Sequence, residues 1–268
     1  HGNNNPVTVG DWKAAIDATV VKQGVFNFVF HPHGWVQNTQ IIEWIDHITE
    51  THGKKVKFLN FREAHERLTK NLLGGHPLKA ANGQDNGVRM LDLNNDGFMD
   101  AIIGNEKLQQ TRLWDPKTKR WNNSPFPFRL VAIDDEGNRS DAGARFGVLQ
   151  PSGNASVFIS NENTRGIWHF DGNAWHQDQA LGQGLELNNQ ALRTSIDGRD
   201  NGVRLRDTDN DGLCEIIVGN PKNQAVFKWN KGQRRWQSTG FNLPENVQIV
   251  RADGSDNGVR FVDINEDG

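Results

Sequence analysis

One motif recurs along this chain and constrains its fold more than any other feature. DNGVRMLDLNNDG begins at Asp85, DNGVRLRDTDNDG at Asp200 and DNGVRFVDINEDG at Asp256, and a variant, DAGAR, begins at Asp141. The four starts are 56, 59 and 56 residues apart. Each complete repeat contains short apolar runs separated by Gly, Asn and Asp, which is typical of β-strands joined by tight turns. From Asp85 onward the chain is therefore predicted to consist of a repeated β unit.

A β-propeller with one four-stranded blade per repeat is the architecture that this period favours. Three complete repeats span 85–140, 141–199 and 200–255, and a fourth, 256–268, stops inside the motif. Propellers close with about four to eight blades, so we expect this sequence to be part of a longer protein. The predicted fold class is mainly β: a partial propeller preceded by a small α/β fragment of a β/α barrel.

Residues 1–73 have a different pattern, in which helical and strand-like segments alternate. The predicted elements are helices at 11–24, 38–53 and 62–73 and buried strands at 25–30 and 56–61. This alternation favours parallel strands with right-handed crossovers, in a segment too small to be a whole α/β domain. The Gly- and Pro-containing stretch 74–84 is the predicted linker to the repeats.

The composition argues against two kinds of partner. With 30 basic and 33 acidic residues the net charge is −3, and no basic stripe of the kind that binds nucleic acid is present. No stretch approaches the roughly 20 apolar residues of a membrane-spanning helix, so we expect no membrane span. Cys214 is the only cysteine, which excludes an internal disulfide and a cysteine-based zinc site. The oligomeric state is left open.

The first and third repeats carry acidic turns in which oxygen-bearing side chains alternate along the chain. Calcium takes six to eight oxygen ligands, and alternate positions of a loop can curl around one ion. Clustered carboxylates also repel one another unless a cation lies between them. We therefore expect Ca²⁺ at positions 1, 3, 5, 7 (through its backbone carbonyl) and 9 of each loop: Asp92, Asn94, Asp96, Phe98 and Asp100, and Asp207, Asp209, Asp211, Leu213 and Glu215. The fourth repeat retains Asp263, Asn265 and Asp267.

The alternative is that Asp, Asn and Gly serve only as turn formers. The second repeat is an internal control, because its turn VLQPSGNAS has no acids at the equivalent positions: Val148, Gln150, Ser152 and Ser156. Carboxylates are not needed to make the turn, so those of the other repeats are predicted to bind an ion with a structural role. Extracellular modules bind Ca²⁺ in the range of about 10⁻⁴ to 10⁻³ M, which indicates the periplasm, the cell surface or the medium.

The stretches DLNNDGFMDAIIGN and DTDNDGLCEIIVGN resemble the FG-GAP and VCBS-type repeats of bacterial surface and secreted proteins, which also occur in integrin-like propellers. The resemblance implies adhesion, carbohydrate contact or assembly, with a polysaccharide or a cell-surface glycan as partner. Two tryptophans at fixed positions in each repeat either pack between blades, which their periodicity favours, or stack on sugar rings. These are Trp114, Trp121, Trp168, Trp175, Trp229 and Trp236.

Two histidines, His31 and His33, directly follow the predicted strand 25–30 in FVFHPHGW. The carboxyl ends of strands carry the active sites of α/β barrels, and histidine suits acid–base chemistry near neutral pH. Surface loop histidines on either side of Pro32 are the alternative interpretation.

GVFNFVFHPHGW, followed by a helix and by KKVKFLNFREAHERL, resembles the closing part of polysaccharide deacetylases of the NodB-homology type, a distorted β/α barrel. The resemblance implies that a late histidine is the general acid of N-acetyl hydrolysis, with His31 the better match and His33 the alternative. It also implies a divalent metal such as Zn²⁺, whose acidic pair and His-x-x-x-His ligands have no counterpart in this sequence. The segment by itself is therefore expected to be inactive.

Two functions remain open. The first is an exported polysaccharide deacetylase fused to a calcium-stabilised propeller that attaches it to its substrate or to a surface. The second is a non-enzymatic, calcium-binding adhesion or carbohydrate-binding protein.

Overall fold

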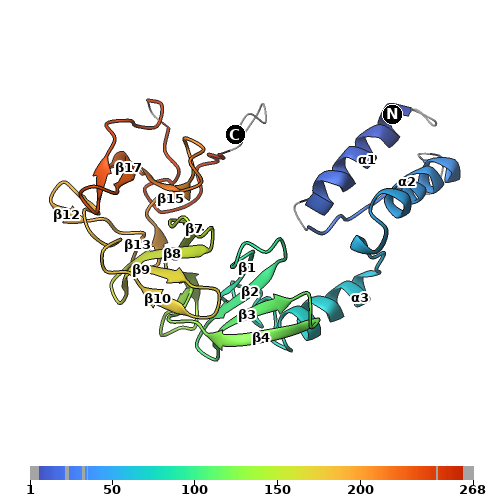
Figure 1. Ribbon diagram of the computed structural model, residues 1–268, viewed down its shortest axis with the longest axis horizontal. Coiled ribbons are helices and arrows are strands. Elements are labelled where there is room, and N and C mark those ends of the chain that lie inside the picture. Colours follow the sequence, from blue (N-terminus) through green and yellow to red (C-terminus); the bar gives the residue numbers. More distant parts are fainter. Residues whose placement is uncertain (1–5, 22–23, 32–33, 35, 246, 262–268) are drawn as a thin grey trace. The chain divides into compact units, whose positions relative to one another are not determined.

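The computed structural model describes residues 6–21, 24–31, 34, 36–245 and 247–261. The chain divides into two compact units, His1–Arg67 and Leu68–Gly268 (Figure 1). In the described part of the chain, no helix combines the length and the apolar character needed to cross a bilayer. The first unit is helical and the second consists largely of antiparallel sheet, so the chain as a whole is mainly β.

Helices dominate the first unit. They are α1 (Pro6–Val21), α2 (Asn38–Thr51), the 3₁₀ turn η1 (Gly53–Lys55), α3 (Phe61–Glu66) and the π-helical turn η2 (Arg67–Leu72), which crosses into the second unit. The α2 helix begins after Gln37, which forms a reciprocal capping box with Gln40. Helices α1 and α2 share a small core built around Ile16, Trp44 and Ile48.

The prediction of buried strands at 25–30 and 56–61 is wrong for this structure, because the described residues of the first unit contain no strand. The segment 25–30 keeps the side-chain alternation of a strand: Phe26 and Phe28 pack on the helical core, whereas Val25 and Val29 are 80% and 78% exposed. A strand is defined by the hydrogen-bonded partner beside it, and these segments have none in the structure. The α/β character expected for residues 1–73 is therefore reduced to helices and extended connections.

Each complete repeat forms one four-stranded antiparallel sheet with its strands in sequence order. The first sheet comprises β1 (Val88–Leu91), β2 (Asp100–Gly104), β3 (Gln109–Asp115) and β4 (Arg120–Pro125). The second comprises β7 (Arg145–Val148), β8 (Ala155–Ser160), β9 (Arg165–Phe170) and β10 (Trp175–Gln177). The third comprises β15 (Val203–Arg206), β16 (Glu215–Gly219), β17 (Gln224–Asn230) and β18 (Arg235–Ser238).

Three short hairpins connect these sheets. They are β5 (Val131–Ile133) with β6 (Arg139–Asp141), β11 (Glu186–Leu187) with β12 (Gln190–Ala191), and β13 (Ser195–Ile196) with β14 (Arg199–Asp200).

The second strand of every sheet is buried along its whole length, because apolar side chains cover both faces of the sheet. One core, which includes Ile102 and Val157, lies between the first and second sheets. Another, which includes Phe158 and Ile216, lies between the second and third. Successive repeats therefore stack sheet against sheet, and the apolar runs of the sequence reflect burial on both faces.

The repeated DNGVR motif forms the turn that enters each sheet. In all four repeats its Asp accepts a hydrogen bond of 2.7–2.9 Å from the Gly N–H two positions on, and pairs with the Arg four positions on at 2.7–2.8 Å. Glycine is required here: Gly202 has φ +70°, and a Cβ would lie 2.4 Å from the carbonyl oxygen of Gly219. The repeated Asp, Gly and Arg of the motif are therefore explained by the conformation of this turn.

Candidate functional site

The two acidic loops connect the first and second strands of the first and third sheets, and they have the same backbone conformation. Asn95 and Gly97 have φ of 56° and 83°, and the equivalent Asn210 and Gly212 have 57° and 82°. Left-handed φ at both positions turns the chain sharply in each loop. The two loops are therefore equivalent in backbone conformation as well as in sequence.

The first carboxylate of each loop organises the turn. Asp92 accepts the N–H groups of Asp96 and Gly97 at 3.1 and 2.9 Å. Asp207 does the same for Asp211 and Gly212, at 3.2 and 2.8 Å. Each of these carboxylate oxygens keeps a second lone pair, so the hydrogen bonds do not exhaust its capacity to bind a cation.

The ninth position of the first loop is the most strongly perturbed acid of the site. Asp100 is fully buried and accepts the N–H groups of Leu93 and Trp114 at 3.0 and 2.8 Å. Burial raises the pKa of Asp100 to about 6, and the negative charges of Asp96 and Asp92 add to the effect against the two hydrogen bonds. These surroundings therefore disfavour the ionised form of Asp100, which a bound cation would stabilise.

Asn94, the third position of the first loop, has an unsatisfied side-chain oxygen. Its side-chain nitrogen donates to Asp96 Oδ2 at 3.0 Å, whereas its Oδ1 is buried without a hydrogen-bond partner. Buried acceptors without a partner are rare in folded proteins and call for an explanation. A cation at the centre of the loop would provide one.

The third loop differs because it contains a positive charge of its own. Lys228 Nζ donates to Asp209 and, at 2.9 Å, to Asp211, and lies 3.6 Å from Glu215 Oε1. Asp209 and Asp211 raise the pKa of Lys228 above its ordinary value, Asp209 having the largest effect. Within the described residues, this repeat has the one set of three carboxylates whose oxygens lie within 4.8 Å of one another, formed by Asp207, Asp209 and Glu215.

Lys228 cannot be recognised from the loop sequence alone, because it lies on the neighbouring strand. Lys228 lies on β17, one residue after Phe227, which pairs with Ile216. In the first sheet the same register places Leu113 one residue after Arg112, which pairs with Ala101. A hairpin register drawn from the repeat alignment would have revealed that only the third loop has a lysine at this place.

The second repeat makes its turn without acids and lies between the two acidic loops. Ala155 N–H donates to the carbonyl oxygen of Leu93 at 2.9 Å, and Cys214 N–H donates to that of Val148 at 2.7 Å. The three loops therefore lie at the same end of successive sheets. Ser156, which stands where Asp100 and Glu215 stand in the other repeats, has a buried hydroxyl without a partner.

Both acidic loops offer only oxygen ligands, which fits a hard cation such as Ca²⁺. Two further observations favour a cation in the first loop: Asn94 Oδ1 is buried without a hydrogen-bond partner, and the Asp100 carboxylate is fully buried. In the third loop the ammonium group of Lys228 already lies beside two of the carboxylates that a cation would contact, Asp209 and Asp211. The carbonyl-bearing seventh residues, Phe98 and Leu213, each donate their N–H to the fifth carboxylate at 2.9 Å.

The six repeat tryptophans have packing roles. Trp236 is 2% exposed, and its Nε1 donates to the carbonyl oxygen of Leu181 in the preceding repeat at 2.7 Å. Trp175 Nε1 donates to Thr111 Oγ1, also in the preceding repeat, at 2.9 Å. None of the six is highly exposed, which favours packing over sugar stacking.

Of the remaining predicted site residues, the structure describes one, His31. His31 is exposed and lies in the extended segment after Phe30. His33, Asp263, Asn265 and Asp267 lie outside the described residues.

No protein-family model matches the chain, and a search of curated proteins found no significant match.

Proposed function

We propose that residues 85–268 form a calcium-stabilised module of propeller type that attaches the protein to a polysaccharide or a cell-surface glycan. The observation that carries the calcium assignment is the first acidic loop. It combines the fully buried Asp100 carboxylate with the unpartnered Asn94 Oδ1, and Leu113 stands at the position where the third loop has Lys228.

The stacking of the sheets supports a propeller. Each four-stranded sheet is one repeat, and the second sheet shares one core with the first sheet and another with the third. The outer face of the third sheet packs in the same way against Val259 and Phe261 of the fourth repeat. Repetition of such packing around an axis is how propellers avoid exposed sheet edges.

The bound ion would be held by Asp92, Asn94, Asp96, the Phe98 carbonyl and Asp100. It would supply positive charge that offsets the repulsion among the carboxylates and ties the ends of β1 and β2 together. Extracellular sites of this kind bind at about 10⁻⁴ to 10⁻³ M, so they fill in compartments with millimolar calcium. The proposal therefore includes a periplasmic, cell-surface or extracellular location.

The test is thermal unfolding of the chain in about 10 mM CaCl₂ and in chelator. For a site of the affinity above, saturation adds about 1.4 to 2.7 kcal/mol, or about 3 to 10 °C in Tm for a unit of this size. Asp96→Ala should remove most of the gain from the first loop. Ser152→Ala, the matched control in the second repeat, should leave the gain unchanged. Equal Tm in calcium and chelator would refute the proposal.

For the first unit, we propose the closing part of a polysaccharide deacetylase barrel, with His31 as the general acid and His33 as the alternative. The segment 25–30 has no partner strand in this structure, but its alternation supports the proposal: Phe26 and Phe28 pack against the helices, whereas Val25 and Val29 are exposed, as in a strand with helices on one face. A catalytic divalent metal such as Zn²⁺ would bind to residues that have no counterpart in this sequence.

The alternative for the whole protein is a non-enzymatic adhesion or carbohydrate-binding protein. Release of acetate from an N-acetylated polysaccharide by the complete protein separates the two. In the deacetylase, His31→Ala should remove one limb of the pH–rate profile while His65→Ala leaves it intact. Absence of acetate release would favour adhesion.

A further inference from the structure

Besides the acidic loops, the described residues bring together one more set of metal-ligating side chains, in the helical unit. Asp17 lies on α1, His47 on α2, and His52 at the C-cap of α2. One ligand atom from each lies within 4.8 Å of the other two. These residues are far apart in the sequence, and the packing of α1 against α2 brings them together.

Both histidines direct the same ring nitrogen at one carboxylate. His52 Nε2 lies 2.5 Å from Asp17 Oδ1, and His47 Nε2 lies 2.9 Å from Oδ1 and 3.1 Å from Oδ2. The two imidazole rings are nearly perpendicular, at 88°, with their centroids 6.2 Å apart. Two rings that approach one point from different directions leave room for a common ligand between their Nε2 atoms.

The end of α2 makes this convergence possible. Residues five apart on a regular helix point about 140° apart, so His47 and His52 would not share a face if α2 continued. His52 is the C-cap, with φ −112° and ψ −22°, and Gly53 follows with φ +52°. The chain therefore leaves the helix at His52 and directs its side chain back to Asp17.

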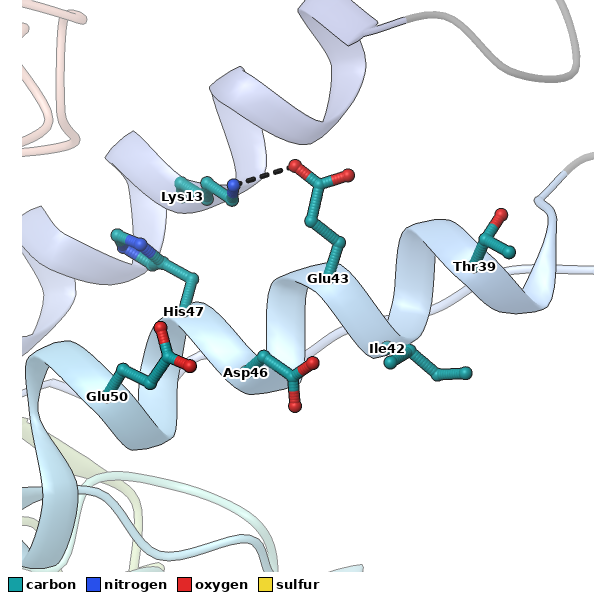
Figure 2. Close-up of a pocket in the computed structure, with 7 residues that line it drawn as sticks. All are labelled: Lys13, Thr39, Ile42, Glu43, Asp46, His47 and Glu50. Carbon is teal, nitrogen blue, oxygen red and sulfur yellow. Dashed lines mark hydrogen bonds and ion pairs between the residues drawn. The ribbon is translucent and has the colours of Figure 1, made fainter.

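The surroundings favour a cation. The side chains of His52 and His47 are 12% and 22% exposed, so both rings are largely shielded from water. Figure 2 shows His47 beside a groove along α2 that is also lined by the acidic Glu43, Asp46 and Glu50. Lys13, the basic residue of this groove, pairs with Glu43 at 2.8 Å.

We propose that Asp17, His47 and His52 bind a first-row divalent metal ion of the Zn²⁺ class, which links α1 to α2. Two imidazole nitrogens and a carboxylate oxygen are donors that such ions prefer, and a water would complete a tetrahedral site. The metal replaces the hydrogen bonds between these groups. The ligand atoms then separate to about 3.3 Å, the spacing set by metal–ligand distances of about 2.0–2.1 Å.

An outer partner is available for one ligand. Thr51 Oγ1 lies 3.4 Å from His47 Nδ1, the ring nitrogen that faces away from Asp17. Contacts of this kind orient a metal-bound imidazole and fix its tautomer. The site does not depend on the calcium loops, whose ligands are all oxygens, or on the deacetylase proposal.

The whole chain, in buffer with excess CaCl₂ to fill the acidic loops, is titrated with Co²⁺ and Zn²⁺. Tetrahedral Co²⁺ gives strong visible absorption, and Zn²⁺ should displace it. Asp17→Asn and His52→Gln should each weaken binding by more than tenfold, since the loss of an outer partner alone costs 10- to 100-fold. Both replacements retain hydrogen-bonding groups, and helical circular dichroism verifies that α1 and α2 persist.

His176→Gln is the matched control. His176 Nε2 lies 2.8 Å from Asp171 Oδ2, the same kind of histidine–carboxylate pair with one histidine instead of two. It should leave metal affinity unchanged. Histidine ring NMR signals give a readout that needs no variant: Zn²⁺ should shift those of His47 and His52.

Three results would overturn the inference. The first is an octahedral Co²⁺ spectrum, the second is unchanged affinity in His52→Gln, and the third is Zn²⁺-induced shifts confined to other histidines. None of these results would change the calcium response of the repeats. The metal site of the helical unit and the calcium site of the repeats can therefore be refuted independently.

Discussion

Lys228 Nζ lies 2.9 Å from Asp211 Oδ2 and thereby places a cation of the chain's own inside the acidic loop of the third repeat. The first loop has the same backbone conformation, but Leu113 stands at the equivalent place on its strand. Two loops that look alike in sequence therefore differ in electrostatics. The difference predicts unequal affinity for calcium.

Replacing Lys228 with Met should strengthen calcium binding to the third loop. The ion no longer has to displace an ammonium group from Asp209 and Asp211, and partly exposed ion pairs of this kind are worth about 1 kcal/mol in total, or about fivefold in affinity. Isothermal titration in an Asp96→Ala background isolates the third loop. Lys231→Met removes a nearby exposed charge that makes no such contact and is the control; equal gains in both variants would show a general charge effect.

Arg145→Met should destabilise the contact between the second and third repeats. Arg145 pairs with Asp141 at 2.7 Å and with Asp200 of the next repeat at 2.9 Å, and its side chain is 11% exposed. Loss of one partner of a buried pair costs about 3 kcal/mol. The matched control is Arg260→Met, because Arg260 forms the same motif pair with Asp256 in an exposed setting, where its loss should cost far less. Chemical denaturation measures the free energy of unfolding of both variants. Equal losses of stability would contradict a role for Arg145 between the two repeats.

The effect of Arg145→Met should depend on pH. Burial raises the pKa of Asp200, but Arg204 and Arg145 more than offset it, so the pKa lies below its ordinary value. A carboxyl group whose pKa is lower in the folded state stabilises the protein at pH values above its unfolded pKa of about 3.9. This stabilisation is lost as the pH falls through the folded-state pKa. The stability gap between wild type and variant should therefore be widest near neutral pH and narrow below about pH 4. A gap independent of pH would indicate that only packing was lost.

Trp236→Phe should cost about 1 to 3 kcal/mol, because it leaves the buried carbonyl oxygen of Leu181 without its donor. Trp236→Ala should cost about 3 to 5 kcal/mol, since it also leaves a cavity between two repeats. Trp229→Phe, at the half-buried tryptophan of the same repeat, should cost less than Trp236→Phe. Unfolding monitored by circular dichroism ranks the three. A sugar-stacking role for Trp236 would predict full stability in Trp236→Phe, which retains an aromatic face.

Gly202→Ala should be far more damaging than Gly240→Ala, although both glycines have left-handed φ, of +70° and +73°. The backbone strain alone costs about 1 to 2 kcal/mol and applies to both. At Gly202 the added Cβ also meets the Gly219 carbonyl oxygen, whereas at Gly240 it meets open space. Differential scanning calorimetry should therefore show a small Tm shift for Gly240→Ala and a large one for Gly202→Ala. Similar shifts would contradict the close approach.

The repeats were the most predictable part of the fold. A period of 56 to 59 residues with apolar runs between turns predicted one β unit per repeat, and each repeat forms a four-stranded sheet. The strands at 25–30 and 56–61 were not reproduced, because an apolar alternating run predicts a strand only where a partner strand is beside it. Helix α1 begins at Pro6, ahead of the predicted start, as proline favours a first helical position.

The candidate sites were predictable where ligands follow one another in a loop and missed where tertiary packing assembles them. The alternating acids of the first and third loops could be read directly from the sequence. Lys228 required the register of a hairpin. The group formed by Asp17, His47 and His52 required both the packing of two helices and the end of one of them, because spacings of three or four residues do not include His47 and His52.

The tryptophan hydrogen bonds run in one direction along the chain. Trp175 and Trp236 each donate to the repeat before their own, and Trp121 donates to Asn71, ahead of the first repeat. During synthesis, which proceeds from the amino terminus, every acceptor has therefore left the ribosome before its donor. Each new repeat can dock on a completed predecessor, so that the stack can assemble one sheet at a time as the chain emerges.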